Sequence, residues 1–312
     1  MKKTLPLLAI AVLSLLGAAC GGGEEPVARL QVEPKTVQLG YPEVQTVRFS
    51  WAPAAPLEDG TAPTVFVHLL DDRDTVVRTF DHPFPQPWRE GVPVEYEVKL
   101  YQSALGDPLP PGSYRLTVGL YNPEGKRWAL EGLGEDLGRH EYLASQVQVP
   151  PNQGPRFAFS NKWLPKEPGG DRQILGRRWM AERSAIRVQG MSDPGTVWMV
   201  VRIPEVSGGE KLVLQGDSKI PSLHIGGNCG TAETNISGPG YHELELPLNP
   251  PPRPDGFCRI LLTPSFQIVP AGTGRPRAVS LENLAWSSSP RAKAASRAAR
   301  RQRQQKEATG ER

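Results

Sequence analysis

The chain has 312 residues, of which 38% are hydrophobic and 22% are charged, and its formal net charge is +3. This length suits about two ordinary domains. The 33 Pro and 32 Gly residues mostly separate short apolar runs, and no long amphipathic helix is visible between them. That punctuation disfavours a helical protein and predicts an all-β fold built from many short strands.

Residues 1–19 have the form of an export signal, with Lys2 and Lys3 before the apolar run Leu5–Leu16 and small residues after it. The run is too short to span a bilayer as a helix. In "LSLLGAACGGG" the small residues lead directly to Cys20, which resembles the lipobox of bacterial lipoproteins. The resemblance implies that Cys20 is diacylated and becomes the new N-terminus. Gly17 stands where that family usually has Leu, so an ordinary secretory signal is the alternative.

Residues 20–26 have almost no apolar surface and are predicted to form a lipidated, flexible tether. The lipid makes a bacterial membrane the first predicted partner. The predicted location is the cell envelope, facing the periplasm or the outer surface.

Cysteine use agrees with export, because Cys229 and Cys258 are the two cysteines left once Cys20 carries lipid. In an oxidising compartment such a pair predicts one disulfide. A metal site is the alternative, but these two cysteines lack the paired C-x-x-C spacing typical of zinc.

The C-terminal segment 291–312 holds 8 Lys or Arg residues against 2 Glu residues, so it carries +6 while the rest of the chain sums to −3. It contains no Leu, Ile, Val or aromatic residue, which predicts a disordered basic tail over 289–312. The simplest interpretation is a solvated terminus. Contact with an anionic envelope surface is the alternative, whereas an exported protein is not expected to bind nucleic acid.

Residues 27–149 read as one β-sandwich. Its short segments are rich in branched and aromatic residues and several alternate with period two. They are "VARLQVE", "VQTVRFSW", "TVFVHLLD", "VPVEYEVKL" and "GSYRLTVGLY". In the last segment, alternation places Tyr114, Leu116, Val118 and Leu120 in the core and Thr117, like its neighbour Arg115, in water.

Residues 150–156 are a predicted linker, and 157–288 read as a second β-sandwich. Its predicted strands are "SAIRVQG", "TVWMVVRIP", "KLVLQG", "HELELPL", "FCRILLTP" and "AVSLENLAW". The last of them must pair near the start of this domain if the sheet is to avoid a loose edge.

Two resemblances follow from longer stretches. "VFVHLLDDRDTVVRTFDHPF" and "PPGSYRLTVGLYNPEGKR" resemble immunoglobulin-like periplasmic domains appended to bacterial membrane glycosyltransferases. "KWLPKE", "GRRWMAERSAIRV" and "SFQIVPAGTGRPRAVSLENLAW" are similar to a jelly-roll domain that accompanies them in envelope polysaccharide proteins. The resemblance implies accessory modules on a lipid anchor, and it supplies no catalytic residue.

Catalytic motifs are missing from the sequence. It contains no G-x-S-x-G elbow, no phosphate-binding G-x-x-x-x-G-K loop and no H-E-x-x-H zinc motif, so no enzyme, cofactor or metal site is predicted. His68 lies in a strand pattern and is interpreted as a packed or rim histidine. The acidic run Asp71–Asp74 is interpreted as a turn rather than a calcium loop.

Trp88 and Trp163 lie in turn-rich segments, where an indole either closes a core or stacks on a sugar. Both are candidate ligand-binding residues. The leading hypothesis is a non-catalytic envelope lipoprotein that binds a surface glycan or a protein of polysaccharide export. The alternatives are an envelope hydrolase or transferase whose acidic residues converge only in three dimensions, and a structural scaffold.

Overall fold

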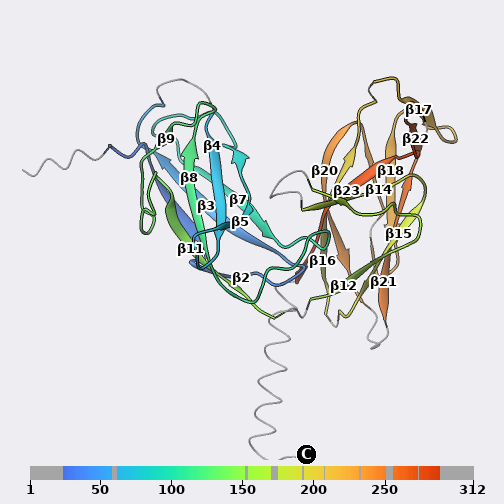
Figure 1. Cartoon of the computed structure of the whole chain (residues 1–312), viewed down its shortest axis with the longest axis horizontal. Helices are drawn as coiled ribbons and strands as arrows, with labels where there is room; N and C mark the ends of the chain where they lie inside the picture. The colour runs from blue at the N-terminus through green and yellow to red at the C-terminus, as the bar shows by residue number, and fades with distance from the viewer. Residues whose placement is uncertain are drawn as a thin grey trace, which may run out of the picture.

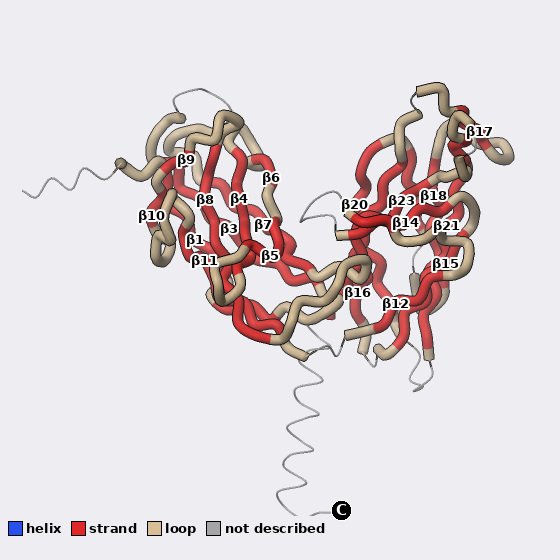
Figure 2. Tube along the Cα trace, viewed as in Figure 1, coloured by secondary structure: helices blue, strands red, loops and turns tan. Residues whose placement is uncertain are grey.

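The computed structural model describes residues 24–57, 62–151, 154–169, 175–191, 193–206, 208–231, 233–250, 256–272 and 274–288. The predicted signal peptide, Cys20 and the predicted tail lie outside these residues. Two β-sandwiches lie side by side, which confirms the predicted all-β fold (Figures 1 and 2). Within the described ranges, no helix is long and apolar enough to cross a bilayer.

The first module has an immunoglobulin-like strand order. One sheet runs β10–β1–β3–β7, and the other runs β2–β11–β8–β4–β5, with β2 parallel to β11. The strands of the first sheet are β1 (Ala28–Glu33), β3 (Val44–Pro53), β7 (Val94–Tyr101) and β10 (Leu130–Glu131). Those of the second are β2 (Thr36–Gln38), β4 (Thr64–Leu70), β5 (Val76–Thr79), β8 (Gly112–Tyr121) and β11 (Tyr142–Val149), joined by the short β6 (His82–Pro83) and β9 (Arg127–Trp128). A chain that switches sheets in this order is typical of immunoglobulin-like sandwiches.

A tyrosine corner supports the same assignment. The hydroxyl of Tyr114, near the start of β8, donates to the carbonyl oxygen of Pro110 at 2.8 Å. Immunoglobulin-like domains use this backward hydrogen bond to fix the connection into that strand. The predicted inward positions of β8, from Tyr114 to Leu120 at every second residue, are all buried.

Thr117 corrects one prediction, because it is fully buried instead of facing water. It does lie on the outer face of β8, but the segment before β11 folds over that face. The Thr117 hydroxyl donates to Glu141 Oε1 at 2.6 Å. At the neighbouring outward position, a Cβ on Gly119 would lie 2.4 Å from the His140 carbonyl oxygen, so only glycine fits beneath this cover.

The second module is a jelly roll of two antiparallel five-stranded sheets. The far sheet runs β12–β15–β21–β18–β19, and the near sheet runs β13–β14–β23–β16–β20. The far sheet consists of β12 (Arg156–Phe159), β15 (Ser184–Gln189), β18 (Ser222–Gly227), β19 (Thr234–Ser237) and β21 (Phe257–Pro264). The near sheet consists of β13 (Glu167–Pro168), β14 (Gly176–Met180), β16 (Gly195–Ile203), β20 (Gly240–Leu248) and β23 (Val279–Ser288), and β17 (Lys211–Leu214) pairs with β22 (Phe266–Val269).

The last strand, β23, lies between β14 and β16 in the near sheet. The prediction that it pairs near the start of the module is therefore confirmed. Its central place explains why eight of its residues, from Val279 to Trp286, are buried on both faces: one side contacts the jelly-roll core and the other is covered.

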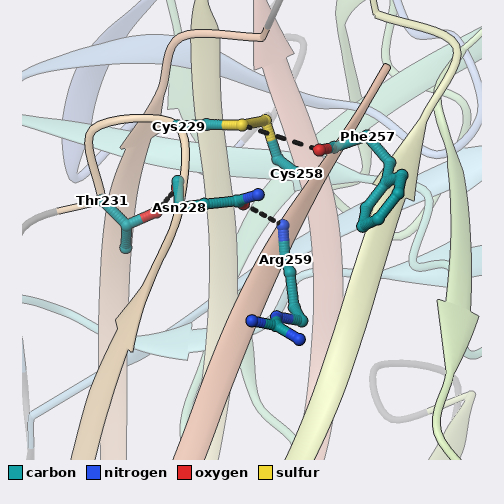
Figure 3. The surroundings of a disulfide bond; sticks show 6 residues. All are labelled: Asn228, Cys229, Thr231, Phe257, Cys258 and Arg259. Atoms are coloured by element: carbon teal, nitrogen blue, oxygen red, sulfur yellow. Dashed lines mark hydrogen bonds between the residues drawn. A yellow bond between two sulfur atoms is a disulfide. The ribbon is translucent and has the colours of Figure 1, made fainter. Parts of the chain in front are cut away.

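A disulfide joins Cys229, which follows β18, to Cys258 in β21, with their Cα atoms 5.7 Å apart (Figure 3). The predicted pairing is confirmed. Beside it, the backbone N–H of Arg259 donates to Asn228 Oδ1 at 2.5 Å. The two links hold the first residues of β21 against the turn that follows β18.

The two modules are docked through the segment that follows β7 and through the residues just before β3. The N–H of Ala104 donates to the Leu284 carbonyl at 2.7 Å, and the N–H of Trp286 donates to the Pro42 carbonyl at 2.8 Å. Leu105, from the first module, is only 1% exposed and packs into the core of the second. The modules thus share backbone hydrogen bonds and apolar packing in addition to the linker.

Candidate binding cleft between the modules

A cleft of about 390 Å³ opens where the two modules meet. Its walls come from the segment around β6, from β7, and from the outer face of the near sheet. The lining side chains are those of Phe80, Asp81, His82, Pro85, Tyr96, Glu97, Val98, Lys99, Tyr101, Trp198 and Glu243. We call this site the intermodule cleft.

Strand alternation explains which side chains enter the cleft. In β16 the residues Val197, Met199 and Val201 are fully buried in the jelly-roll core, so Trp198 points outward from the near sheet. It is nonetheless only 4% exposed, because the ring of Tyr101 packs on it with centroids 4.8 Å apart. The two rings form the floor that joins the modules.

An ion-pair network crosses the cleft. Lys99 of the first module pairs with Glu243 and, at 2.9 Å, with Glu245 of the second. Trp198 Nε1–H also donates to Glu243 Oε1 at 2.8 Å. Burial opposes ionisation of Glu243, but the hydrogen bonds from Lys99 and Trp198 outweigh it and lower the pKa of this carboxyl. Burial alone would lower the pKa of Lys99, but its hydrogen bonds and ion pairs with Glu243 and Glu245 raise it.

The opposite wall carries neutral aromatic groups. His82 contacts the Phe80 carbonyl oxygen through Nδ1 and the Tyr96 hydroxyl through Nε2, both at 2.9 Å. Burial lowers the pKa of His82 and raises that of Tyr96, which keeps both groups uncharged at neutral pH. A neutral His82 can therefore donate from Nδ1 and accept the Tyr96 proton at Nε2.

Together these groups offer ring surfaces, a cation and carboxylate oxygens around one hollow. Such a mixture suits a small polar ligand with apolar faces, since rings contact C–H surface and charged groups accept or donate hydrogen bonds. Among the described residues, no group of three or more His, Cys, Asp or Glu side chains is placed to hold a metal ion.

His68 lies outside the cleft, in a second cluster on the outer face of β4 and β8. Its Nδ1 lies 3.2 Å from Glu141 Oε1, and its Nε2 lies 3.7 Å from Asp81 Oδ1. Burial alone would lower the pKa of His68, but hydrogen bonding and the charges of these two carboxylates raise it to about 9. Hydrogen bonding to His68 lowers the pKa of Glu141 to about 2, against the effect of burial. His68, which the sequence analysis interprets as a packed or rim histidine, is thus a partly buried histidine with two carboxylate partners.

Trp88, a predicted ligand-binding residue, is half-buried at the end of the first core. Its ring lies 5.0 Å from that of Phe84, and its Nε1–H donates to the Ala55 carbonyl at 2.9 Å. It also lines a separate hollow of about 450 Å³, together with Leu57, Phe84 and Pro87. This position serves the core and still presents ring surface to solvent.

Trp163, the other predicted ligand-binding residue, is 6% exposed and belongs to the second core. Its Nε1–H donates to the Ala185 carbonyl at 3.0 Å, and Phe159 packs edge-on against it. The surroundings match the core-closing interpretation. The structure does not bring Trp163 and Trp88 together, because they lie in different modules.

The acidic run after β4 has the geometry of a turn. Asp71 Oδ1 accepts the backbone N–H groups of Thr75 at 2.8 Å and Arg73 at 2.9 Å. The hydrogen bond from Thr75, with that from Arg73, lowers the pKa of Asp71. The carboxylate thus caps its own turn, as that interpretation requires.

The intermodule cleft itself was not predicted from the sequence. Trp198 lies in a predicted strand, and its alternation with the core residues Val197 and Met199 places it on the outer face. This alternation could have placed Trp198 outside the jelly-roll core. Nothing local connects Lys99 with Glu243, which are 144 positions apart.

No protein-family model and no curated protein matches the chain. Among solved structures, the mosquito-larvicidal Cry4Aa toxin of Bacillus thuringiensis is similar at 9% identity, over 86% of this chain and 54% of the toxin, with a TM-score of 0.26. CBD12 from CALX1.2 is similar at 14% identity, over 80% of this chain and 81% of that one, with a TM-score of 0.20. Both TM-scores are too low to indicate a shared function, and the chain spans about half the length of the toxin.

Proposed function

We propose that this protein is a non-catalytic lipoprotein of the bacterial envelope that binds a surface glycan in the intermodule cleft. Cys20 anchors it to the membrane, and the two sandwiches act as accessory modules in polysaccharide export or assembly. The resemblance of both modules to domains that accompany envelope glycosyltransferases is consistent with this role.

The observation that carries the proposal is the composition of the cleft. Rings of Tyr96, Tyr101 and Phe80 stand beside Lys99 and Glu243 around a hollow of about 390 Å³. Sugars combine C–H faces with many hydroxyl groups, so a ligand of this class can use both the rings and the charges.

The protonation state of the cleft favours binding over hydrolysis. A glycoside hydrolase needs a carboxylic acid whose pKa is raised so that it can protonate the leaving oxygen. Glu243 has the opposite property, because its contacts with Lys99 and Trp198 lower its pKa. Asp81 is engaged by the Val67 N–H at 3.0 Å and by His68. Glu243 and Asp81, two of the three carboxylates that line the cleft, thus have structural partners.

The test is retention of the chain on polysaccharide extracted from the envelope of the producing organism. Lys99→Met keeps the aliphatic stem but removes the charge that spans the cleft, and we expect about tenfold weaker retention in affinity electrophoresis. Lys35→Met, at an exposed position of the same module, is the matched control and should bind as the wild type does.

Two results would overturn the proposal: no retention of the wild type, or equal retention of the Lys99→Met and Lys35→Met variants. Melting curves of both variants accompany the assay, because a loss of binding counts only where the fold is retained.

A further inference from the structure

The outer face of the far sheet carries exposed arginines. In β15 and β21 the core residues are Ile186, Val188, Cys258 and Ile260, so the alternate residues Arg187 and Arg259 point to solvent. Figure 1 shows this sheet on the side of the jelly roll that is turned away from the first module. Arg156 of β12 is exposed on the same face. We call Arg156, Arg187, Arg259 and Phe257 the arginine face.

The register places two positive charges side by side. Arg187 lies directly opposite Arg259 across the β15–β21 pair. Like charges at opposed positions of a sheet destabilise it. Among the described residues, no acidic side chain forms an ion pair with Arg156, Arg187 or Arg259. Glu233 is a carboxylate on this side of the sheet, with its side chain over Gly226.

An aromatic ring accompanies the charges. Phe257 is 37% exposed, and the guanidinium carbon of Arg187 lies 4.4 Å from the centre of its ring. Stacking of this kind restricts the Arg187 side chain while leaving its N–H groups free for a ligand. Figure 3 shows Phe257 and Arg259 on either side of Cys258, whose disulfide and the adjacent Asn228 contact fix this part of β21.

The charge of the whole module agrees with the local arrangement. Residues 156–288 contain 15 Lys or Arg against 12 Asp or Glu, a net charge of +3, whereas residues 24–155 contain 11 against 19, a net charge of −8. A polyanion is therefore repelled by the first module and attracted to the second.

We propose that the arginine face binds a polysaccharide bearing carboxylate groups, that is, a polymer of uronic acid type. A guanidinium fork pairs with a carboxylate through two parallel hydrogen bonds, and the Phe257 ring matches the C–H face of a sugar. A bound carboxylate also relieves the repulsion between Arg187 and Arg259. This site lies on another sheet than the intermodule cleft and does not rest on it.

Polygalacturonate is the probe, with the full chain in affinity electrophoresis. We expect the double variant Arg187→Gln, Arg259→Gln to bind about tenfold more weakly than the wild type, because two charge-assisted contacts are lost. The matched control is Arg202→Gln. Arg202 lies 5.4 Å from the ring of Tyr241, which is 57% exposed, so it is an arginine–aromatic pair on the near sheet of the same module.

The basic segment 291–312 attracts polyanions in every variant, so the measurement is repeated without it and the ratio between variants is compared. Equal retention of the double variant and the Arg202→Gln control overturns the proposal, as does equal retention of the wild type by neutral dextran. Polyphosphate is a polyanion without sugar rings, so it tests whether negative charge alone explains the binding. If it is held as strongly as polygalacturonate, and Phe257→Ala weakens neither, the assignment to a polysaccharide is wrong.

Discussion

The ion pairs of His68 connect two carboxylates that approach it from different segments, Asp81 beside β6 and Glu141 before β11. The folded pKa of His68, about 9, lies above its ordinary value of 6.5, so its stabilising contribution is complete below pH 6.5 and disappears as the pH rises through 9. For Glu141 the folded pKa of about 2 lies below 4.5, so its contribution is complete above pH 4.5 and disappears as the pH falls through 2.

We therefore predict that the wild type is less stable at about pH 10 than at about pH 6, and that His68→Gln removes part of this difference. At about pH 6 the variant should lose about 1–3 kcal/mol, because the partly buried carboxylates of Asp81 and Glu141 lose a charged partner. Urea unfolding at both pH values measures the two effects.

The matched control is His224→Gln, since His224 lies on the far sheet and contacts Asn235. It should keep the pH dependence of the wild type. An unchanged pH dependence in His68→Gln would show that the cluster does not act as described.

The two predicted ligand-binding tryptophans should respond differently to replacement by alanine. Trp163→Ala removes a ring from the second core and should cost about 3–5 kcal/mol. Trp88→Ala tests two causes, because the ring packs on Phe84 and also lines an open hollow. A ligand role for Trp88 predicts nearly unchanged melting and lost retention on the extracted polysaccharide. A stability loss with retention intact would assign Trp88 to the core.

At the scale of strands, the sequence patterns predicted β1, β3, β4, β7, β8, β15, β16, β17, β20, β21 and β23. Strands with weaker signals were missed: β14 carries two arginines, and β18 ends in two glycines. Alternation also cannot say what covers an outward residue. Thr117 shows this, since its burial depends on a segment 24 positions away in the sequence.

The disulfide joins the turn that follows β18 to β21 of the far sheet, across 29 positions. Chain entropy alone predicts that reducing it costs about 3.6 kcal/mol, because the unfolded chain is freed from a closed loop and gains conformational entropy. Urea unfolding with and without reductant measures this difference. Thiol titration of the unfolded, unreduced protein should find neither Cys229 nor Cys258 free, and two free thiols would contradict the pairing.

The segment after β7 makes a prediction about the docking of the modules. Leu105→Ala should cost about 2–5 kcal/mol and act on the second module, because its side chain is packed in that core. Leu109→Ala is the matched control, since Leu109 lies four residues on but belongs to the first core. Hydrogen exchange resolved by segment distinguishes them, and loosening of the first module alone by Leu105→Ala would contradict the docking.

At the scale of the molecule, the sequence predicted two sandwiches but not the intermodule cleft. The cleft is assembled from β7 and the near sheet, whose approach depends on the Leu105 contact and on backbone hydrogen bonds. Neither the Leu105 contact nor these backbone hydrogen bonds can be recognised from a pattern in the sequence. Trp88 and Trp163 were chosen from their local composition, which does not distinguish a ring that closes a core from a ring that meets a ligand.

The predicted lipid anchor at Cys20 concerns the molecule as a whole. We predict that Cys20→Ser abolishes labelling of the protein by a fatty-acid probe in cells and releases it from the membrane fraction, because the thiol is the acceptor of the lipid. Unchanged labelling and fractionation would contradict acylation at Cys20. Replacing Ser14 by Ala in the same segment is the control and should leave both unchanged.

The docking of an acidic module to a basic one has a consequence for orientation. Charges of −8 and +3, held apart along the longest axis of the molecule, create a permanent electric dipole directed along that axis (Figure 1). The described chain begins in the negative module, so a lipid at Cys20 would bring the negative pole to the bilayer. Anionic head groups exert a torque on such a dipole that turns its positive pole toward them, and the tether at 20–26 opposes that rotation. The angle at which the molecule stands on its membrane should therefore change with ionic strength.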